Sequence, residues 1–555
     1  MPELTMHPTR RTPIDMLDHW AETCPDRVFL RQPEKGRYRE LTWKQVREQA
    51  RRIGGALNHL GLVPGDRIAL LAKNCAEWFV ADLAIMLGGY VSVPVYPTAN
   101  AETIRYILEH SGARAAFIGR LDRPTRQSRA VGPDILRFGL PQATVSLDHA
   151  WDRLLDMAEP LLAPAPDPGL TMTLVYTSGS TGQPKGVVHT FASLSWAGET
   201  IGEDLAATPH DRTVSYLPLA HITERAYIEM GSFFSGNSVA FVESIDSFVA
   251  DIQRAKPTMF ISVPRLWALF RERILRALGP RKLDLLLAIP RLGDFVRRRI
   301  RTDLGLSHAR LLGCGSAPVA PAILEWYERI GLNISEGWGM TENSAYGTIQ
   351  LPFRRDKIGS VGRPALGAEF RVSERGELLF RSPGLMAGYY KQPAETAAVM
   401  TADGFLRTGD LGYVDDDGYV FITGRVKDIF KTAKGLYVSP TAIEQNLAKA
   451  DDVDLACVVG SGLPQPVALV QLTEAARSEP HERIRARLLA KLEELNAALA
   501  HHERLDAIVV AAEPWSVENG AMTPTLKIRR HTVERRFLDS GKSIRGGVVV
   551  WQDEA

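Results

Sequence analysis

The most informative stretch of this chain reads Thr177-Ser178-Gly179-Ser180-Thr181-Gly182-Gln183-Pro184-Lys185-Gly186-Val187, directly after the apolar run Leu174-Val175-Tyr176. Glycines let a loop turn tightly and bring backbone N–H groups close to an anion. The hydroxyl side chains add short donors, and Lys185 adds a point charge. A strand followed by such a loop predicts a cradle for a polyphosphate. A flexible surface loop is the alternative, against which the preceding strand and the terminal Pro-Lys-Gly both argue.

This loop differs from a Walker-type phosphate loop. Lys185 follows Pro184 and precedes Gly186, whereas the Walker lysine is followed by Ser or Thr. The sequence therefore disfavours a phosphate-loop kinase.

The composition is that of an ordinary globular protein of more than one domain. The chain has 555 residues, with 45% hydrophobic and 24% charged residues and a net charge of +1, which gives no indication of nucleic-acid binding. Four cysteines without metal-ligand spacing fit a reducing compartment. Because the N-terminus lacks an apolar signal core, we expect a cytoplasmic protein with no membrane-spanning segment.

The order of apolar runs predicts an α/β fold. Strands are expected at 66–72, 90–95 and 115–118, with helices at 76–87 and 101–110 between them. This alternation indicates a largely parallel sheet covered by helices. After a proline-rich linker, further strands are expected at 214–216, 258–263 and 311–314.

The pattern changes in the last third of the chain. From about Ile358 to Thr423, short strands and turns predict a β-rich subdomain. A smaller α/β unit follows, with helices expected at 440–450 and 484–500 and strands at 456–459 and 507–510. We therefore divide the chain into a large N-terminal domain, 1–424, and a small C-terminal domain, 425–555.

Several polar motifs, each taken alone, have a purely structural interpretation as well as a functional one. Gly337-Trp338-Gly339-Met340-Thr341-Glu342 is consistent with a tight turn around a buried tryptophan, or with an aromatic face for a flat base followed by groups for a phosphate and Mg²⁺. Gly315-Ser316-Ala317-Pro318 is consistent with a helix N-terminus, Ser316 near the cap and Pro318 in the first turn.

Three further residues, Asp410, Lys527 and His221, also have an ordinary structural interpretation when each is taken alone. Gly-Asp at 409–410 is most often a turn, although a buried-edge carboxylate is also a good acceptor for two ribose hydroxyls. Lys527 would normally be a solvated charge. A lone histidine such as His221 is usually a hydrogen-bonded structural residue.

Taken together and in this order, the motifs resemble the AMP-forming adenylate-forming superfamily of acyl-CoA synthetases, luciferases and adenylation domains. The resemblance covers roughly residues 15 to 540. The segment Met522-Thr523-Pro524-Thr525-Leu526-Lys527 and the loop from Phe430 to Pro440 are most similar to bacterial long-chain fatty acyl-CoA synthetases.

The resemblance implies a role for each motif. Thr177, Ser178, Gly179, Ser180, Thr181, Gly182 and Lys185 would bind the phosphates, and Gly315, Ser316, Ala317, Pro318, Gly337, Trp338 and Gly339 would form the adenine pocket. Thr341 would contact the α-phosphate, Glu342 Mg²⁺, Asp410 the ribose, and Arg425 ribose or phosphate. Lys527 would be the catalytic lysine, His221 would position the acid, and Lys427 would be the hinge. Lys434 and Gly435 would line the pantetheine channel.

The implied activity is ATP-dependent activation of a carboxylic acid. A medium- to long-chain fatty acid would form an acyl-adenylate with release of pyrophosphate, and CoA would then take the acyl group. Alternatives are transfer to an acyl carrier protein, an aryl or other acid as substrate, and a non-catalytic nucleotide- or lipid-binding protein on the same fold.

One segment lies outside these motifs. From Arg265 to Arg301 the chain is strongly basic, and the apolar residues Leu266, Trp267, Phe270, Ile274, Leu275 and Leu278 recur in it at helical spacing. The pattern is typical of an amphipathic helix packed on the core. It is also consistent with peripheral contact with the inner face of a membrane.

Overall fold

The structure is a computed structural model that describes residues 11–177, 183–244, 246–517, 519–523, 527–539 and 548–553. Within these ranges, the largest sheet has eight strands. Their order is β19 (Gly388–Tyr389), β9 (Lys185–Thr190), β8 (Thr171–Thr177), β4 (Val91–Val95), β3 (Arg67–Leu71), β5 (Ala113–Ile118), β6 (Leu136–Gly139) and β7 (His149–Ala150).

The predicted α/β alternation is confirmed in this sheet. The strands from β8 to β7 are parallel, whereas β9 pairs antiparallel with both β8 and β19. Helix α3 (Ala76–Leu87) has the predicted bounds and is buried along its whole length. Its apolar run is therefore the signature of a fully enclosed helix.

Two more sheets complete the α/β layers of the large domain. The first has the order β10 (Arg212–Ser215), β11 (Ser238–Phe241), β1 (Val28–Glu34), β2 (Arg37–Thr42). The second has the order β12 (Met259–Ser262), β13 (Leu311–Cys314), β14 (Ile334–Trp338), β15 (Thr348–Ile349), β16 (Arg363–Pro364).

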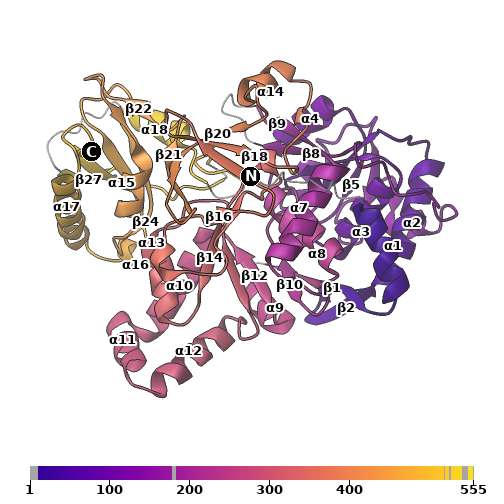
Figure 1. Cartoon of the computed structure of the whole chain (residues 1–555), viewed down its shortest axis with the longest axis horizontal. Helices are drawn as coiled ribbons and strands as arrows, with labels where there is room; N and C mark the ends of the chain where they lie inside the picture. Colours follow the sequence, from indigo (N-terminus) through magenta and orange to yellow (C-terminus); the bar gives the residue numbers. More distant parts are fainter. Residues whose placement is uncertain are drawn as a thin grey trace.

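The β-rich subdomain and the small α/β unit also follow the expectation. The former is an antiparallel sheet, β17 (Glu369–Val372), β18 (Glu377–Arg381), β20 (Leu406–Val414), β21 (Val420–Arg425). The latter contains the hairpin β22 (Phe430–Lys431) and β23 (Tyr437–Val438), and the sheet β24 (Val453–Val459), β25 (Val467–Leu472), β26 (Ala507–Val510), β27 (Val548–Trp551). Figure 1 places this C-terminal unit on one side of the large domain.

Helices connect and cover these sheets (Figure 1). In the large domain they are α1 (Pro13–Thr23), α2 (Trp43–His59), α4 (Ala101–Ser111), α5 (Pro124–Ser128), α6 (Trp151–Leu155), α7 (Phe191–Asp204), the π-helix η1 (Glu224–Met230), α8 (Gly231–Ser235), α9 (Phe248–Ala255), α10 (Pro264–Leu278), α11 (Pro280–Ala288), α12 (Leu292–Asp303), α13 (Pro321–Arg329), the 3-10 turns η2 (Thr341–Asn343) and η3 (Arg355–Lys357), and α14 (Pro393–Val399). The C-terminal unit has α15 (Pro440–Leu447), α16 (Glu474–Arg477), α17 (His481–Ala498) and α18 (Arg530–Asp539).

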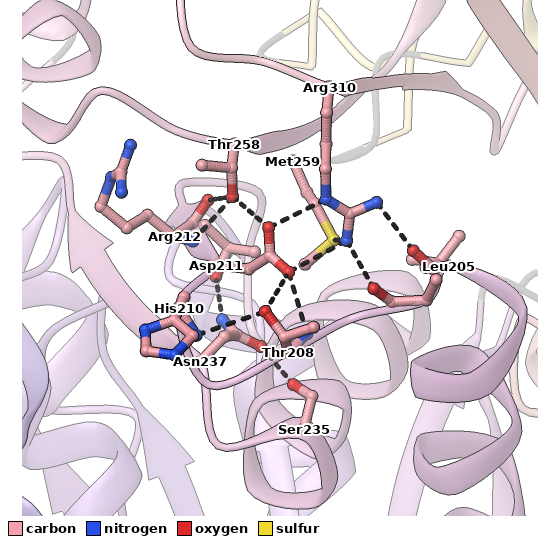
Figure 2. Close-up of polar contacts among 12 residues, drawn as sticks. Leu205, Thr208, His210, Asp211, Arg212, Ser235, Asn237, Thr258, Met259 and Arg310 are labelled. Carbon is pink, nitrogen blue, oxygen red and sulfur yellow. Dashed lines mark hydrogen bonds and ion pairs between the residues drawn. The ribbon is translucent and has the colours of Figure 1, made fainter.

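An ion pair joins two of the sheets (Figure 2). Arg310, just before β13, donates to both oxygens of Asp211, just before β10, at 3.0 Å each. The Thr258 hydroxyl donates to the same carboxylate at 2.6 Å, and Arg310 also caps the carbonyl of Leu205 at the end of α7. These contacts lower the pKa of the buried Asp211 carboxyl to about 2, against the effect of burial.

A second charge cluster lies entirely inside the large domain. Arg225 of η1 contacts Asp82 of α3 at 3.0 Å and Glu229 at 3.3 Å, and all three side chains are fully buried. Burial raises the pKa of Glu229 well above its usual value. The protonated form of Glu229 is therefore favoured, and the charges of Arg225 and Asp82 balance.

Candidate functional site

Three of the predicted residues meet where β14 faces the β20–β21 pair. Trp338, at the end of β14, donates its indole N–H to Oδ2 of Asp410 at 2.8 Å. Arg425, the register partner of Asp410 on β21, contacts Oδ1 at 2.9 Å. The Trp338 ring also packs edge-on against Phe370 and Phe380. Tryptophan here is therefore both a flat wall and a hydrogen-bond donor to the carboxylate.

Lys527 of the C-terminal unit lies among the same groups. Burial and then the Arg425 guanidinium lower its pKa, the carboxylates of Asp410 and Glu342 oppose both effects, and the result is a pKa of about 8. Arg425, Asp410 and Glu342 thus all influence the ammonium group of Lys527. A lysine with this pKa carries its charge at neutral pH and loses it in mildly alkaline solution.

His221 faces this lysine from the large domain. Burial, followed by repulsion from Lys527, lowers the pKa of His221 to about 3. Its Nδ1 accepts a hydrogen bond from the backbone N–H of Thr223 at 3.3 Å. The imidazole is therefore neutral and held by its own loop, which suits a positioning residue.

Thr341 and Glu342 are held in place by residues that the sequence analysis did not assign. The ring of His189 donates to the carbonyl of Thr341 at 2.8 Å, and burial keeps the pKa of His189 near 4, so the ring is neutral. The phenol of Tyr389 donates to Oε1 of Glu342 at 2.7 Å. Lys185 pairs with Glu395 at 2.5 Å and lies 5.0 Å from the centre of the Tyr389 ring. The phosphate-loop lysine and Glu342 are thus linked through one tyrosine.

The glycines of the site are required by close backbone approach. A Cβ at Gly339 would lie 2.2 Å from the backbone of Ala345, and one at Gly315 would lie 3.0 Å from the carbonyl of Gly337. Neither position has room for a larger residue without a shift of backbone.

The expected helix start at 316–318 is wrong. Helix α13 begins at Pro321 with Ala320 as its N-cap, and Ala317 and Pro318 lie in irregular backbone before it. Ser316 instead has a positive φ of 67° and its hydroxyl lies 3.0 Å from that of Thr223. The segment is therefore a loop directed at the site.

A pocket lies beneath this loop. Its cavity volume is about 40 Å³, and its lining includes Thr223, Tyr227, Ile261, Gly313, Ser316, Gly337, Trp338 and Ile349. Tyr227 belongs to the π-helix η1, and such helices are frequent at functional sites. The lining combines apolar side chains and backbone with the hydroxyl groups of Thr223, Tyr227, Ser316 and Ser335.

The remaining predicted residues lie elsewhere or outside the description. Thr177 ends β8, but Ser178, Gly179, Ser180, Thr181 and Gly182 lie outside the described residues. Lys427 follows β21 in an exposed turn. Lys434 and Gly435 lie in the exposed loop between β22 and β23 and do not join the Trp338–Asp410–Lys527 cluster.

A magnesium ion is implied by the resemblance. Among the described residues there is no group of three or more His, Cys, Asp or Glu that could hold a metal by itself. Mg²⁺ usually rests on one or two carboxylates together with substrate phosphates. The Glu342 carboxylate fits that description, and Lys185, which also contacts Tyr389, would hold the phosphates. Over the same residues, no helix combines the length and apolar character needed to cross a membrane.

Comparisons with known proteins show the family of the chain. Residues 17–390 match the AMP-binding enzyme family, and residues 427–542 match the AMP-binding enzyme C-terminal domain. The chain is 30% identical to the long-chain-fatty-acid–CoA ligase FadD15 of Mycobacterium bovis, over 94% of both chains. It is 29% identical to the peroxisomal long chain acyl-CoA synthetase 7 of Arabidopsis thaliana, over 96% of this chain and 86% of that protein.

Solved structures share the fold. The anthranilate CoA ligase AuaEII in complex with anthranoyl-AMP superposes with a TM-score of 0.80 and 23% identity, over 96% of this chain and 98% of that one. The o-succinylbenzoate CoA synthetase of Bacillus subtilis in complex with its acyl-adenylate superposes with a TM-score of 0.74 and 22% identity, over 97% and 99% of the two chains.

Proposed function

Because this chain belongs to the family of AMP-binding enzymes, we propose that it is an AMP-forming acid–thiol ligase that converts a medium- to long-chain fatty acid into its CoA thioester. The curated relatives named as long-chain fatty acid ligases support the fatty acid and CoA. The observation that carries the proposal is the position of Lys527, which comes from the C-terminal unit into a cluster with Asp410, Arg425 and Glu342.

The first half-reaction forms the adenylate. A carboxylate oxygen of the acid attacks the α-phosphorus of ATP, the bond to the bridging oxygen breaks, and pyrophosphate leaves. The Lys527 ammonium neutralises charge on the phosphate during this step. The Trp338 ring contacts the adenine of the nucleotide, and the Asp410 carboxylate binds the ribose hydroxyls. To do so, Asp410 gives up part of its contact with Trp338 and Arg425.

Neighbouring groups orient the reactants. His221 is neutral, and a fatty acid is already ionised at neutral pH, so the imidazole positions the acid and abstracts no proton. Lys185, Thr341 and the motif at residues 177–182 would hold the phosphates. Mg²⁺ at Glu342 would supply charge neutralisation on the departing pyrophosphate.

The second half-reaction transfers the acyl group. The thiol sulfur attacks the acyl carbonyl carbon, the bond from that carbon to the phosphate oxygen breaks, AMP leaves, and the thiol proton passes to solvent. For this step we propose that a C-terminal domain, 425–555, rotates about Lys427 relative to the 1–424 domain. The rotation would withdraw Lys527 and bring Lys434 and Gly435 to the pantetheine arm.

An ATP–pyrophosphate exchange screen over fatty and aryl acids tests the proposal. Exchange with long-chain acids and little with aryl acids is expected, because the curated relatives are named as ligases or synthetases of long-chain acyl groups. Exchange only with aryl acids would favour the alternative of an aryl-acid ligase. No exchange with any acid would favour a non-catalytic binding protein.

The acceptor needs its own assay, because CoA and an acyl carrier protein share the pantetheine arm. Thioester formation with CoA in the absence of carrier protein is expected. Transfer only to holo carrier protein would make the enzyme an acyl-AMP ligase that loads a carrier. We further propose a cytoplasmic location with peripheral contact at the inner membrane face.

A further inference from the structure

The basic segment of residues 265–301 folds into three helices with different surroundings. Helix α10 buries Trp267, Phe270 and Ile274 in the second core of the large domain, as the pattern of a packed amphipathic helix predicts. In contrast, α11 buries only Leu283 and α12 only Gly293 and Ile300. Figure 1 shows α11 and α12 at the lower edge of the molecule, projecting beyond α10.

Three of the four arginines of α10 are directed at the C-terminal unit. Arg265 pairs with Asp454, Arg271 with Asp451 at 3.4 Å, and Arg276 with Glu474 at 3.1 Å. Most of the positive charge in the first part of the basic segment therefore has protein partners.

The second part, which we term the docking hairpin (residues 280–303), exposes large apolar side chains. Leu285 is 66% exposed, Phe295 58%, Ile289 44% and Leu292 36%. Leu292 and Phe295 are one helical turn apart and lie on one face of α12. Apolar residues scattered singly over a surface are ordinary, but four within eleven positions of one projecting hairpin are a patch.

Cations without a carboxylate partner accompany this patch. Within the described part of the chain, Arg281, Lys282, Arg291 and Arg298 make no ion pair, and all four are exposed. Arg281 is one turn from Leu285, and Arg298 is one turn from Phe295. Arg297 and Arg299, by comparison, pair with Asp294 and Asp303 on their own helix.

We propose that the docking hairpin binds the surface of an anionic lipid bilayer, with Leu285, Ile289, Leu292 and Phe295 in the interface and the four unpaired cations at the lipid phosphates. Apolar side chains flanked by Lys and Arg on short helices are the composition of a peripheral membrane anchor. A cation near a charged bilayer adds attraction that falls off within a Debye length. The contact is thus weak, reversible and sensitive to salt.

Such docking would bring the enzyme to its substrate if the proposed function holds, since a free long-chain acid partitions into bilayers. The surface argument itself is independent of the reaction. Vesicle binding is therefore measured without acid or ATP, and pyrophosphate exchange with a water-soluble acid is measured separately. Failure of one leaves the other standing.

The test is co-sedimentation of the full chain with vesicles of phosphatidylcholine alone or with phosphatidylglycerol, at low and high salt. Binding is expected only to the vesicles with phosphatidylglycerol and at low salt. A variant with Arg281→Gln, Lys282→Gln, Arg291→Gln and Arg298→Gln is expected to bind at least ~10-fold more weakly. Leu285→Ser with Phe295→Ser should also weaken binding.

Matched controls lie elsewhere on the surface. Arg37, Lys44, Arg126 and Arg483 are exposed cations that can be changed to Gln together, and Leu162 and Leu170 are 78% and 51% exposed and can be changed to Ser. Both control variants should bind vesicles as the unmodified protein does. Absence of binding at low salt, or equal loss in hairpin and control variants, would overturn the proposal. Self-association that disappears with Leu285→Ser and Phe295→Ser, without vesicle binding, would assign the patch to a second copy of the chain.

Discussion

Trp338 and Asp410, 72 positions apart in the sequence, are joined directly by a 2.8 Å hydrogen bond from indole to carboxylate. The proposed base-stacking wall and the proposed ribose acid are therefore one unit, which Arg425 completes from the next strand. This contact orients the carboxylate independently of any ligand.

Replacement of Trp338 by Phe keeps an aromatic face and removes the donor. We expect a loss of about 1–3 kcal/mol in the free energy of unfolding, because a buried carboxylate loses a partner, together with a rise in the KM for ATP. Urea denaturation and exchange kinetics measure the two. In the control, Trp20→Phe removes an indole bond to the carbonyl of Phe233 far from the site. Trp20→Phe should lower stability and leave the KM for ATP unchanged. An unaltered KM for ATP in Trp338→Phe would contradict the role of Trp338 in nucleotide binding.

Lys527→Ala should reduce adenylation by on the order of 10²- to 10³-fold, the usual effect of removing one charge-stabilising contact in a transition state. Conversion of supplied acyl-adenylate to thioester should be nearly unchanged, because the lysine is withdrawn for that step. Equal losses in both half-reactions would reject this division. In the unmodified enzyme, pyrophosphate exchange should fall as pH rises through about 8, where Lys527 loses its proton, and Lys527→Arg should lack that alkaline limb.

Lys427→Pro should have the opposite effect. A fixed φ at the turn after β21 hinders rotation of the small domain, so exchange should remain near normal while thioester formation slows. Stopped-flow or quenched assays of each half-reaction measure this. Lys427→Ala removes the side chain and leaves the backbone free, and it should be close to normal in both steps. If Lys427→Pro is also normal in both, the pivot lies elsewhere.

Asp211→Asn should lower the free energy of unfolding by about 2–4 kcal/mol at pH 7, because Arg310 and Thr258 lose a buried acceptor. The folded-state pKa near 2 lies below the ordinary value. The carboxylate therefore contributes its full stability above about pH 4, and this contribution disappears as pH falls towards 2. The gap between the two proteins in urea midpoint should shrink over that range. Asp148→Asn, at the half-exposed pair with Arg137, should cost less than ~1 kcal/mol.

The ion pairs from α10 should favour the domain orientation of the first half-reaction. Asp454→Asn, Asp451→Asn and Glu474→Gln together should slow adenylation a fewfold and leave thioester formation unaffected, with a smaller salt dependence of adenylation than in the unmodified enzyme. The combination of Arg271→Glu with Asp451→Arg re-forms this ion pair with its charges reversed. Its adenylation rate should therefore lie between that of the triple variant and that of the unmodified enzyme. If adenylation is equally sensitive to salt in the triple variant, these pairs do not hold the orientation.

Sequence patterns predicted the elements that are continuous in the chain. Helix α3 and strands β13 and β26 have the expected bounds because each is a buried apolar run with clear ends. The order of motifs also predicted a site, and three of its residues, Trp338, Asp410 and Arg425, lie in contact. The start of α13 was mispredicted because Pro318 and Pro321 are both acceptable in a first turn, and Ala320 provides no side-chain cap as a signal.

Contacts between distant segments could not be predicted. Glu395 is 210 positions from Lys185, and Tyr389 is 47 from Glu342, so no local period relates them. His189 has a weak signal, since it follows the phosphate loop on β9, but its bond to Thr341 depends on how two sheets pack. The same holds for Arg310 and Asp211, which meet only after β10 and β13 are placed.

The buried trio of Asp82, Arg225 and Glu229 limits which substitutions the protein tolerates at these three positions. Loss of Arg225 would strand the Asp82 carboxylate without a counter-charge in an interior that offers little solvation. Glu229 is favoured in its neutral form, so Gln at that position changes the charge least. Substitution of Glu229 can therefore come first. Asp82 and Arg225 can then be replaced only together, because either one alone would leave a buried charge without its partner.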